Sequence, residues 1–124
     1  MDDRPNWDPF RALARRVLRE GAPLVLTDGV RALLLRTAEE VAISDATAAV
    51  STEEGALALV REAARRITDG SNRLTDALHL MWKYQRAGDY ASARQQMLDV
   101  LAVEVVPYYR AMAQGQLDDM ADAP

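Results

Sequence analysis

The sequence has no cysteine, and it has only one histidine, one lysine and one phenylalanine among its 124 residues. Without cysteine it can form no disulfide, no thiolate nucleophile and no thiolate metal site. It contains no apolar run near the roughly 20 residues that cross a bilayer. Its first residues, Met-Asp-Asp-Arg-Pro, are acidic where a secretion signal is basic. We therefore expect a cytoplasmic protein with no membrane contact.

Positive charge is also in the minority. The formal net charge is −4 and the pI is near 4.9, whereas a protein that neutralises many phosphates carries a basic face. The basic residues are fourteen arginines and Lys83. Together with the abundant alanine, this bias indicates a GC-rich bacterial genome. We expect no nucleic acid among the partners.

What the chain does have is the pattern of α-helices. Its length suits one domain with a core of its own, and 49% of its residues are hydrophobic, as in ordinary globular proteins. Apolar residues recur at helical spacing, and no segment alternates like a strand. Turn and capping residues divide the chain into about five helices at Gly21, Ser44-Asp45, Asp69-Gly70-Ser71 and Gly88-Asp89. The sequence predicts a single compact all-α bundle.

The domain is expected to cover residues 7–115. Residues 1–6 are predicted to be a flexible N-terminus, because no periodic pattern begins before Trp7. Residues 116–124 are acidic and are predicted to be a frayed tail.

The most informative spacing in the chain is Tyr84, Gly88, Asp89, Tyr90 and Ala93. It predicts a helical hairpin that turns at Gly88-Asp89, with small and aromatic residues where two antiparallel helices meet. Downstream, the predicted last helix contains a proline at position 107. Because proline removes a helical hydrogen bond, we expect this helix to be kinked there.

Few residues support catalysis. Asp76 lies one helical turn before His79, so an orienting Asp–His pair is geometrically possible, but no serine or threonine is marked as a nucleophile. The adjacent carboxylates Glu39-Glu40 and Glu53-Glu54 fit solvated helix faces or helix starts better than metal sites, and no EF-hand spacing exists. We expect no enzyme activity, no metal and no cofactor.

Residues 38–50 resemble a helix-turn-helix in their placement of small residues and a short second helix. In DNA-binding proteins that second helix enters the major groove. Here it would present Asp45, Thr47, Ala48 and Ala49, none of which reads base edges as Arg, Lys, Asn or Gln do. A DNA-linked regulator is therefore the alternative hypothesis, and a capped turn between two core helices is the favoured interpretation.

Aromatic residues gather in the C-terminal third of the chain. Trp82, Tyr84, Tyr90, Tyr108 and Tyr109 fall within 28 residues, and the adjacent pair Tyr108-Tyr109 points about 100° apart on a helix. Either all five rings pack internally around the kink, or some form a surface for a partner. We take Tyr108, Tyr109 and Trp82 as the candidate partner surface.

The chain as a whole, over about residues 7 to 120, resembles the DUSAM-domain family, small proteins that occur as many paralogues in myxobacteria. The segments that carry the resemblance are Trp7-Asp8-Pro9 with Leu13 to Leu18, Gly21-Ala22-Pro23-Leu24 with Leu26-Thr27-Asp28 and Val30 to Leu34, Val41-Ala42-Ile43-Ser44, Glu54-Gly55-Ala56, Gly88-Asp89-Tyr90 with Ala93 to Met97, and Val103 to Pro107 with Tyr109-Arg110. The resemblance implies a bacterial, cytosolic, all-helical domain of unknown function. It supplies no site residues.

The sequence therefore predicts a non-enzymatic protein–protein interaction or regulatory module. Its partner is expected to be another protein, and a second copy of the chain is the simplest one.

Overall fold

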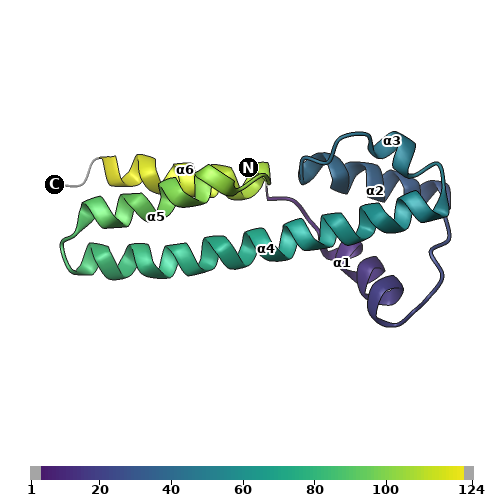
Figure 1. Ribbon diagram of the computed structural model, residues 1–124, viewed down its shortest axis with the longest axis horizontal. Coiled ribbons are helices and arrows are strands. Elements are labelled where there is room, and N and C mark those ends of the chain that lie inside the picture. Colours follow the sequence, from purple (N-terminus) through teal and green to yellow (C-terminus); the bar gives the residue numbers. More distant parts are fainter. Residues whose placement is uncertain (1–3, 122–124) are drawn as a thin grey trace. The chain divides into compact units, whose positions relative to one another are not determined.

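The computed structural model describes residues 4–121, and all regular secondary structure within them is helical. The prediction of an all-α protein is confirmed. The elements in chain order are α1 (Asp8–Ala14), the π-helix η1 (Arg15–Arg19), α2 (Asp28–Glu40), α3 (Ala46–Ala49), α4 (Glu53–Arg86), α5 (Tyr90–Val103) and α6 (Pro107–Ala121) (Figure 1).

Contacts along the chain separate two compact units, Met1–Ile67 and Thr68–Pro124. The long helix α4 contributes its first part to unit 1 and its second part to unit 2. Each unit has buried apolar side chains of its own and is described separately below.

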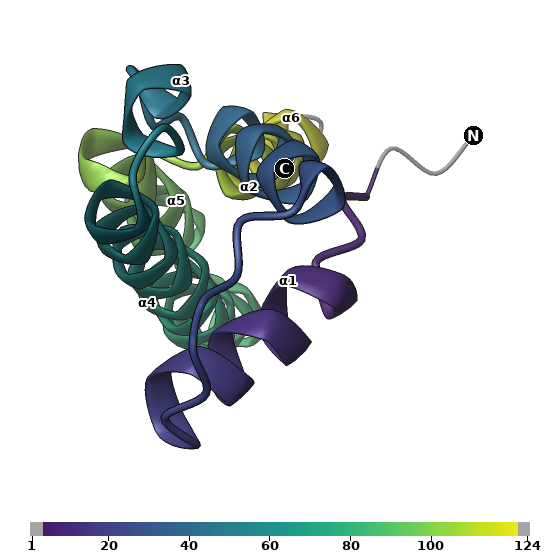
Figure 2. The same cartoon turned by 90° about the vertical axis from the view of Figure 1, so that its right-hand side faces the viewer.

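Unit 1 consists of α1, η1, α2, α3 and the first part of α4. Figure 2 shows α1 continuing into η1, from which a connecting segment leads to α2. Apolar side chains from every α-helix or its flanks are buried in this unit, among them Phe10, Leu34, Val50 and Val60. Thr27 caps the start of α2, because its hydroxyl accepts the N–H of Val30 at 3.1 Å.

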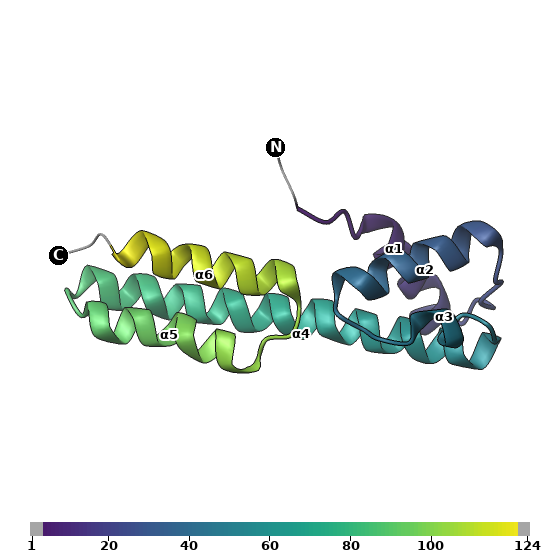
Figure 3. The same ribbon diagram turned by 90° about the horizontal axis from the view of Figure 1, so that it is seen from above.

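Unit 2 is a three-helix bundle formed by the second part of α4, α5 and α6, which lie side by side in Figures 1 and 3. Each helix buries one apolar stripe. The buried residues are Leu74, Ala77 and Met81 from α4, Ala93, Met97 and Val100 from α5, and Tyr109, Ala113 and Met120 from α6.

The predicted break at Asp69-Gly70-Ser71 is wrong, because α4 runs through these residues without interruption. The sequence reads as a break because Asp, Gly and Ser each favour caps or turns over helix interiors. Gly70 has another purpose here: it is buried, and a side chain at this position would collide with the ring of Tyr109. The glycine allows a close approach between helices rather than a turn.

The predicted kinked last helix is also wrong, because the chain forms two helices in its place. Helix α5 ends at Val103, residues 104–106 are not helical, and Pro107 is the first residue of α6. A proline at the first helical position loses nothing, since its missing N–H would have no partner within the helix. The chain therefore uses Pro107 to start a helix.

The expected acidic tail at 116–124 overlaps the end of α6. That helix continues to Ala121, and its Met120 side chain is buried. Residues 122–124 lie outside the described part of the chain. At the other end, residues 4–7 precede α1 without regular structure, and Trp7 is already buried.

The predicted hairpin turn at Gly88-Asp89 is present. The N–H groups of Gly88 and Asp89 donate to the carbonyls of Gln85 and Tyr84, which closes α4 with a Schellman motif. Gly88 has φ +79°, in the left-handed region that favours glycine. Asp89 then begins α5 by accepting the N–H of Ser92 at 3.1 Å. The hydroxyl and backbone N–H of Ser92 hold the pKa of the Asp89 carboxyl below its ordinary value.

The Ala42 turn after α2 repeats this geometry with a less suitable residue. The N–H groups of Ala42 and Ile43 donate to the carbonyls of Glu39 and Ala38, and Ala42 has φ +62°. The left-handed conformation costs an alanine roughly 1–2 kcal/mol that glycine does not lose.

We expect Gly88→Val to lower the free energy of unfolding by about 1 kcal/mol or more, because a β-branched residue is strained at φ +79°. The reciprocal change, Ala42→Gly, should raise it by about 0.5 kcal/mol, the relief of strain being partly offset by the greater freedom of glycine in the unfolded chain. Thermal and denaturant unfolding of both variants measures this. An unchanged melting temperature in Gly88→Val would contradict the assignment of this turn.

Candidate functional site

The most densely connected polar cluster of unit 2 centres on Glu104, in the connector between α5 and α6. Its side chain is 1% exposed. The Oε1 atom accepts a hydrogen bond from Nη1 of Arg73 on α4 at 2.7 Å. The Oε2 atom accepts the backbone N–H groups of Val105 and Val106 at 3.0 and 2.9 Å. Both carboxylate oxygens are therefore engaged, one by a cation and one by the chain that leads into α6.

These bonds explain why the connector is not helical. The carboxylate of Glu104 takes over as acceptor for two N–H groups that would otherwise seek partners in a continuing helix. Its negative charge also lies just before the N-terminus of α6, where the helix dipole favours it. Arg110, one turn into α6, donates from Nη1 to the carbonyls of Leu101 and Glu104 at 2.7 and 2.9 Å.

Gly70 and Tyr109 complete this cluster. A Cβ built on Gly70 would lie 2.6 Å from Cε2 of Tyr109 and 2.9 Å from Oε1 of Glu104. Real Cβ atoms essentially never approach so closely, so α4 can reach the start of α6 only because residue 70 has no side chain. We call Gly70, Arg73, Glu104, Tyr109 and Arg110 the Glu104 cluster.

The Glu104 cluster fits a structural role better than a chemical one. A general acid or base must reach a substrate, whereas the Glu104 carboxylate is buried and bonded at both oxygens. Among the described residues, every buried side-chain nitrogen and oxygen has a hydrogen-bond partner. The arrangement fixes the angle between two helices and offers no free group to a ligand.

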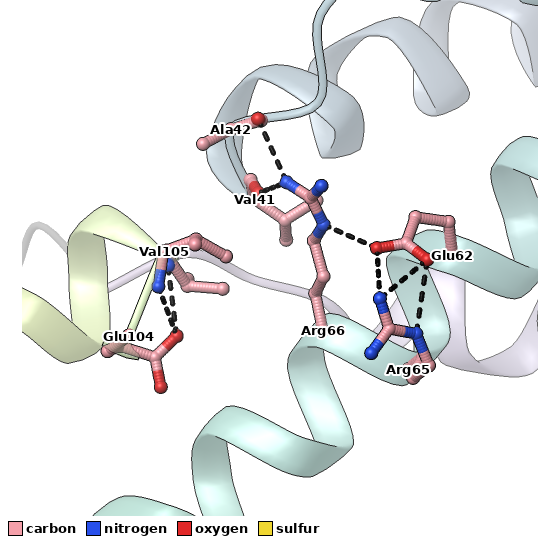
Figure 4. A network of polar contacts seen from close by, with 8 residues as sticks. Val41, Ala42, Glu62, Arg65, Arg66, Glu104 and Val105 are labelled. Carbon is pink, nitrogen blue, oxygen red and sulfur yellow. Dashed lines mark hydrogen bonds and ion pairs between the residues drawn. The ribbon is translucent and has the colours of Figure 1, made fainter. Parts of the chain in front are cut away.

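Unit 1 has a comparable cluster on α4, shown in Figure 4. Nη1 of Arg66 donates to the carbonyls of Val41 and Ala42, both at 2.9 Å, at the end of α2. Glu62 orients this arginine by accepting from its Nε at 2.7 Å. Hydrogen bonds from Arg65 and Arg66 hold the pKa of the Glu62 carboxyl below its ordinary value. Arg66 thus binds the carbonyls that the end of α2 leaves without helical partners.

Asp76 and His79, the only residues considered for catalysis, lie one turn apart on α4 and both are exposed. A catalytic dyad gains its perturbed proton affinity from a site that excludes water. Within residues 4–121, no group of three or more His, Asp or Glu residues is placed to hold a metal ion. In the same part of the chain, no helix has the length and apolar character needed to span a bilayer.

The three aromatic residues of the predicted partner surface are not brought together. Tyr109 is 5% exposed and packs in the Glu104 cluster, Tyr108 is half-buried, and Trp82 is 48% exposed. The two tyrosine rings lie 5.7 Å apart. Tyr109 lies against α4 at Gly70. Trp82 is twelve residues further along α4, or about 18 Å from that contact.

The 38–50 segment forms the end of α2, a turn and the four-residue helix α3. Two residues of the turn, Ala42 and Asp45, adopt positive φ. On α3 the exposed residues are Thr47 and Ala48, and neither reads base edges by bidentate hydrogen bonds. Helix α3, the second of the two helices expected here, has only four residues, about one turn.

The apolar surface that the sequence analysis did not identify lies on and just after α5. Leu98, Val103 and Val105 are 48%, 61% and 48% exposed. We call these three residues the α5 surface. The sequence contained a signal for this surface, because α5 is apolar on more than one side. Leu98 and Val103 do not share the buried stripe of Ala93, Met97 and Val100.

One family comparison gives a match. The sequence model of a family described as "Protein of unknown function (DUF2379)" matches residues 5–120. No curated protein and no solved structure matches the chain.

We expect Gly70→Ala to destabilise the protein by about 2 kcal/mol, because the new methyl group would displace Tyr109 or Glu104. Helix propensity alone would predict a gain in stability, since it favours alanine over glycine by about 1 kcal/mol. Gly115→Ala in α6 is the matched control, since a Cβ there meets nothing within 4 Å, and it should stabilise by up to about 1 kcal/mol. Denaturant unfolding of the two variants compares them. Equal effects would exclude a close contact at Gly70.

We expect Arg73→Met to lower the free energy of unfolding by about 2 kcal/mol, because it leaves the buried Glu104 carboxylate without its cation. This loss is smaller than for a fully buried pair, since the Arg73 side chain is 36% exposed. The double variant Arg73→Met/Glu104→Gln should lose less stability than the two single variants together, because the isolated charge is then absent. A double-mutant cycle of unfolding free energies measures this coupling. Additive losses would show that the pair does not act together.

Proposed function

The chain belongs to the DUF2379 family of proteins of unknown function, and we propose that it is a non-enzymatic protein–protein interaction module that binds through the α5 surface. That this family is the DUSAM-domain family, and that the protein is bacterial and cytoplasmic, are parts of the same proposal.

The observation that carries the proposal is the exposure of Leu98, Val103 and Val105 in one 14-residue helix and the connector after it. A helix that is apolar on several sides is normally buried on several sides. The side chains of α5 that are buried within unit 2 are those of Ala93, Met97 and Val100. The remaining apolar side chains need another surface to be removed from water, and each is worth about 1.5–3 kcal/mol when fully buried.

The neighbouring groups suit a protein partner. Leu101, three residues after Leu98 and therefore on the same side of α5, is half-buried. Gln95 and Asp99, which hydrogen-bond to each other at 2.8 Å, supply polar groups on the same helix. Protein interfaces combine apolar contacts with hydrogen-bonding groups of this kind.

A second copy of the chain is the simplest partner, because one apolar helix surface can serve both sides of a two-fold interface. Two antiparallel α5 helices would place Leu98 of each copy against the apolar residues of the other. Trp82 on α4 is 48% exposed, and we expect its ring to contribute to such an interface. Tyr109, which packs within the Glu104 cluster, is left out of this proposal, and Tyr108 is not needed for it.

We expect Leu98→Gln/Val103→Gln to weaken self-association by at least about 2 kcal/mol, or roughly thirtyfold, if these residues are interface anchors. Glutamine keeps a good helix propensity, so the stability of the folded chain should change by less than about 1 kcal/mol. Sedimentation equilibrium and thermal melts measure the two effects separately.

Val25→Gln is the matched control, because Val25 is 63% exposed but lies in unit 1, outside the α5 surface. It should leave association unchanged. Tyr109→Ala should behave in the opposite way to the α5 variant, lowering stability by about 3 kcal/mol through loss of a buried ring. A wild-type chain that stays monomeric at high concentration would rule out the homodimer and leave the interaction proposal dependent on a different protein.

A further inference from the structure

Helix α1 and its extension η1 carry a concentration of arginine that neither the core nor the α5 surface uses. Arg11, Arg15, Arg16 and Arg19 are all exposed, while Phe10, Leu13 and Ala14 of the same helical segment are buried. Residues 8–21 hold these four arginines against Asp8 and Glu20, a formal charge of +2 in a chain whose net charge is −4.

Most of this positive charge is unpaired. Elsewhere in the chain, Arg31 pairs with Asp28, Arg65 and Arg66 with Glu62, and Arg73 with Glu104. The other unpaired arginines of the described range, Arg36, Arg61, Arg86 and Arg94, lie singly along the sequence. On α1, Arg11 lies 4.0 Å from Asp8. The side chains of Arg15, Arg16 and Arg19 make no hydrogen bond or ion pair with any residue in the described range 4–121.

The backbone places these three arginines close together. They all belong to η1, a π-helical turn of five residues, and π-helical turns are rare and occur often at functional sites. Arg15 and Arg19 lie about one turn apart and so leave the same side of the helix, and Arg16 leaves the neighbouring side. Leu18, 36% exposed, borders Arg15 and Arg19 on the side away from Arg16.

The helix dipole accounts for part of this arrangement only. A cation in the last turn stabilises a helix by roughly 0.3–1 kcal/mol when exposed, and one arginine would provide that. Three arginines in five residues also repel one another when no anion is near. An external anion that relieves this repulsion would bind with a favourable electrostatic contribution.

We infer that Arg15, Arg16 and Arg19, together with Leu18, form a docking site for an acidic segment of a partner protein. Carboxylates accept bidentate hydrogen bonds from guanidinium groups, and arginine is the basic residue best suited to such pairing. A partner helix with carboxylates at i and i+4 and an apolar residue between them would match both the charges and Leu18.

Charge distribution favours a short acidic segment over a longer polyanion. The remainder of the chain outside residues 8–21 has a formal charge of −6, obtained from −4 for the whole and +2 for this segment. A nucleic acid that extended beyond η1 would meet this negative charge. A membrane surface would require the apolar side of the helix, and Phe10, Leu13 and Ala14 are already buried in unit 1.

This inference goes beyond the proposed function, because it identifies a second surface, in unit 1, and the chemistry of what binds there. It does not require the α5 surface, so the two can be tested independently.

The experiment uses the full chain and a short synthetic helical peptide that carries glutamates at i and i+4 around one leucine. Wild-type protein should bind this peptide at low salt, and binding should weaken as salt is raised. Arg15→Gln/Arg16→Gln/Arg19→Gln should weaken binding about tenfold or more, the result expected from three exposed ion pairs. Circular dichroism and a thermal melt establish that the variant is folded.

Arg36→Gln/Arg61→Gln/Arg86→Gln is the matched control. It removes the same charge from three other exposed arginines, so it should bind the peptide like the wild type. The charge-reversed variant Arg15→Glu/Arg16→Glu/Arg19→Glu should lose the acidic peptide and bind a peptide in which lysine replaces glutamate. Leu98→Gln/Val103→Gln should bind the acidic peptide normally.

Three results would overturn the inference. The acidic peptide could fail to bind the wild type, the two arginine triple variants could weaken binding equally, or a short DNA duplex or anionic vesicles could bind more tightly than the peptide in an η1-dependent way. None of these results would affect self-association through the α5 surface, which sedimentation of the Leu98 and Val103 variant measures separately.

Discussion

The bonds of Glu104 determine the architecture of unit 2. One buried carboxylate joins Arg73 of α4 to the backbone of the connector that starts α6. A buried charge is costly unless it is paired and hydrogen-bonded, so the chain cannot move this connector without losing both the cation and the two amides. Gly70 allows the approach, Tyr109 fills the space beside it, and Arg110 binds the carbonyl of Glu104 itself. Together these contacts hold the start of α6 against α4, while the apolar stripes of the three helices form the core.

Unit 1 solves a related problem with a cation. Arg66 on α4 binds the last carbonyls of α2 and is held by Glu62. In both units, a charged side chain thus joins α4 to the backbone at the end or the start of a neighbouring helix. Hydrogen bonds within each unit therefore occupy the polar atoms of Arg66, Glu62 and Glu104. The apolar side chains of the α5 surface and the arginines of η1 have no such role in the fold.

The two surfaces differ in what they would recognise. The α5 surface offers apolar area and suits a partner that buries it, whereas η1 offers unpaired positive charge and suits a partner with carboxylates. Apolar contacts contribute most of the affinity of an interface, and complementary charges contribute specificity and rate. A module that joins two partners could use one surface for each. Its membership in the DUF2379 family is compatible with such a role and assigns none.

Local sequence was sufficient to predict helices and the turn at Gly88-Asp89, because each depends on residues within about one helical turn. It was not sufficient for Gly70 or Pro107. A glycine breaks helices by default, and only a tyrosine 39 positions away explains why this one lies inside α4. A proline within an apolar periodic run predicts a kink, whereas in the folded chain Arg73, 31 positions away, pairs with Glu104 in a non-helical connector and Pro107 starts a new helix. The partner surfaces depended even more on tertiary structure, because exposure is a property of the folded chain. Tyr109 and Leu98 are both large apolar residues on predicted helices, and packing alone decides that the tyrosine is buried while the leucine remains in water.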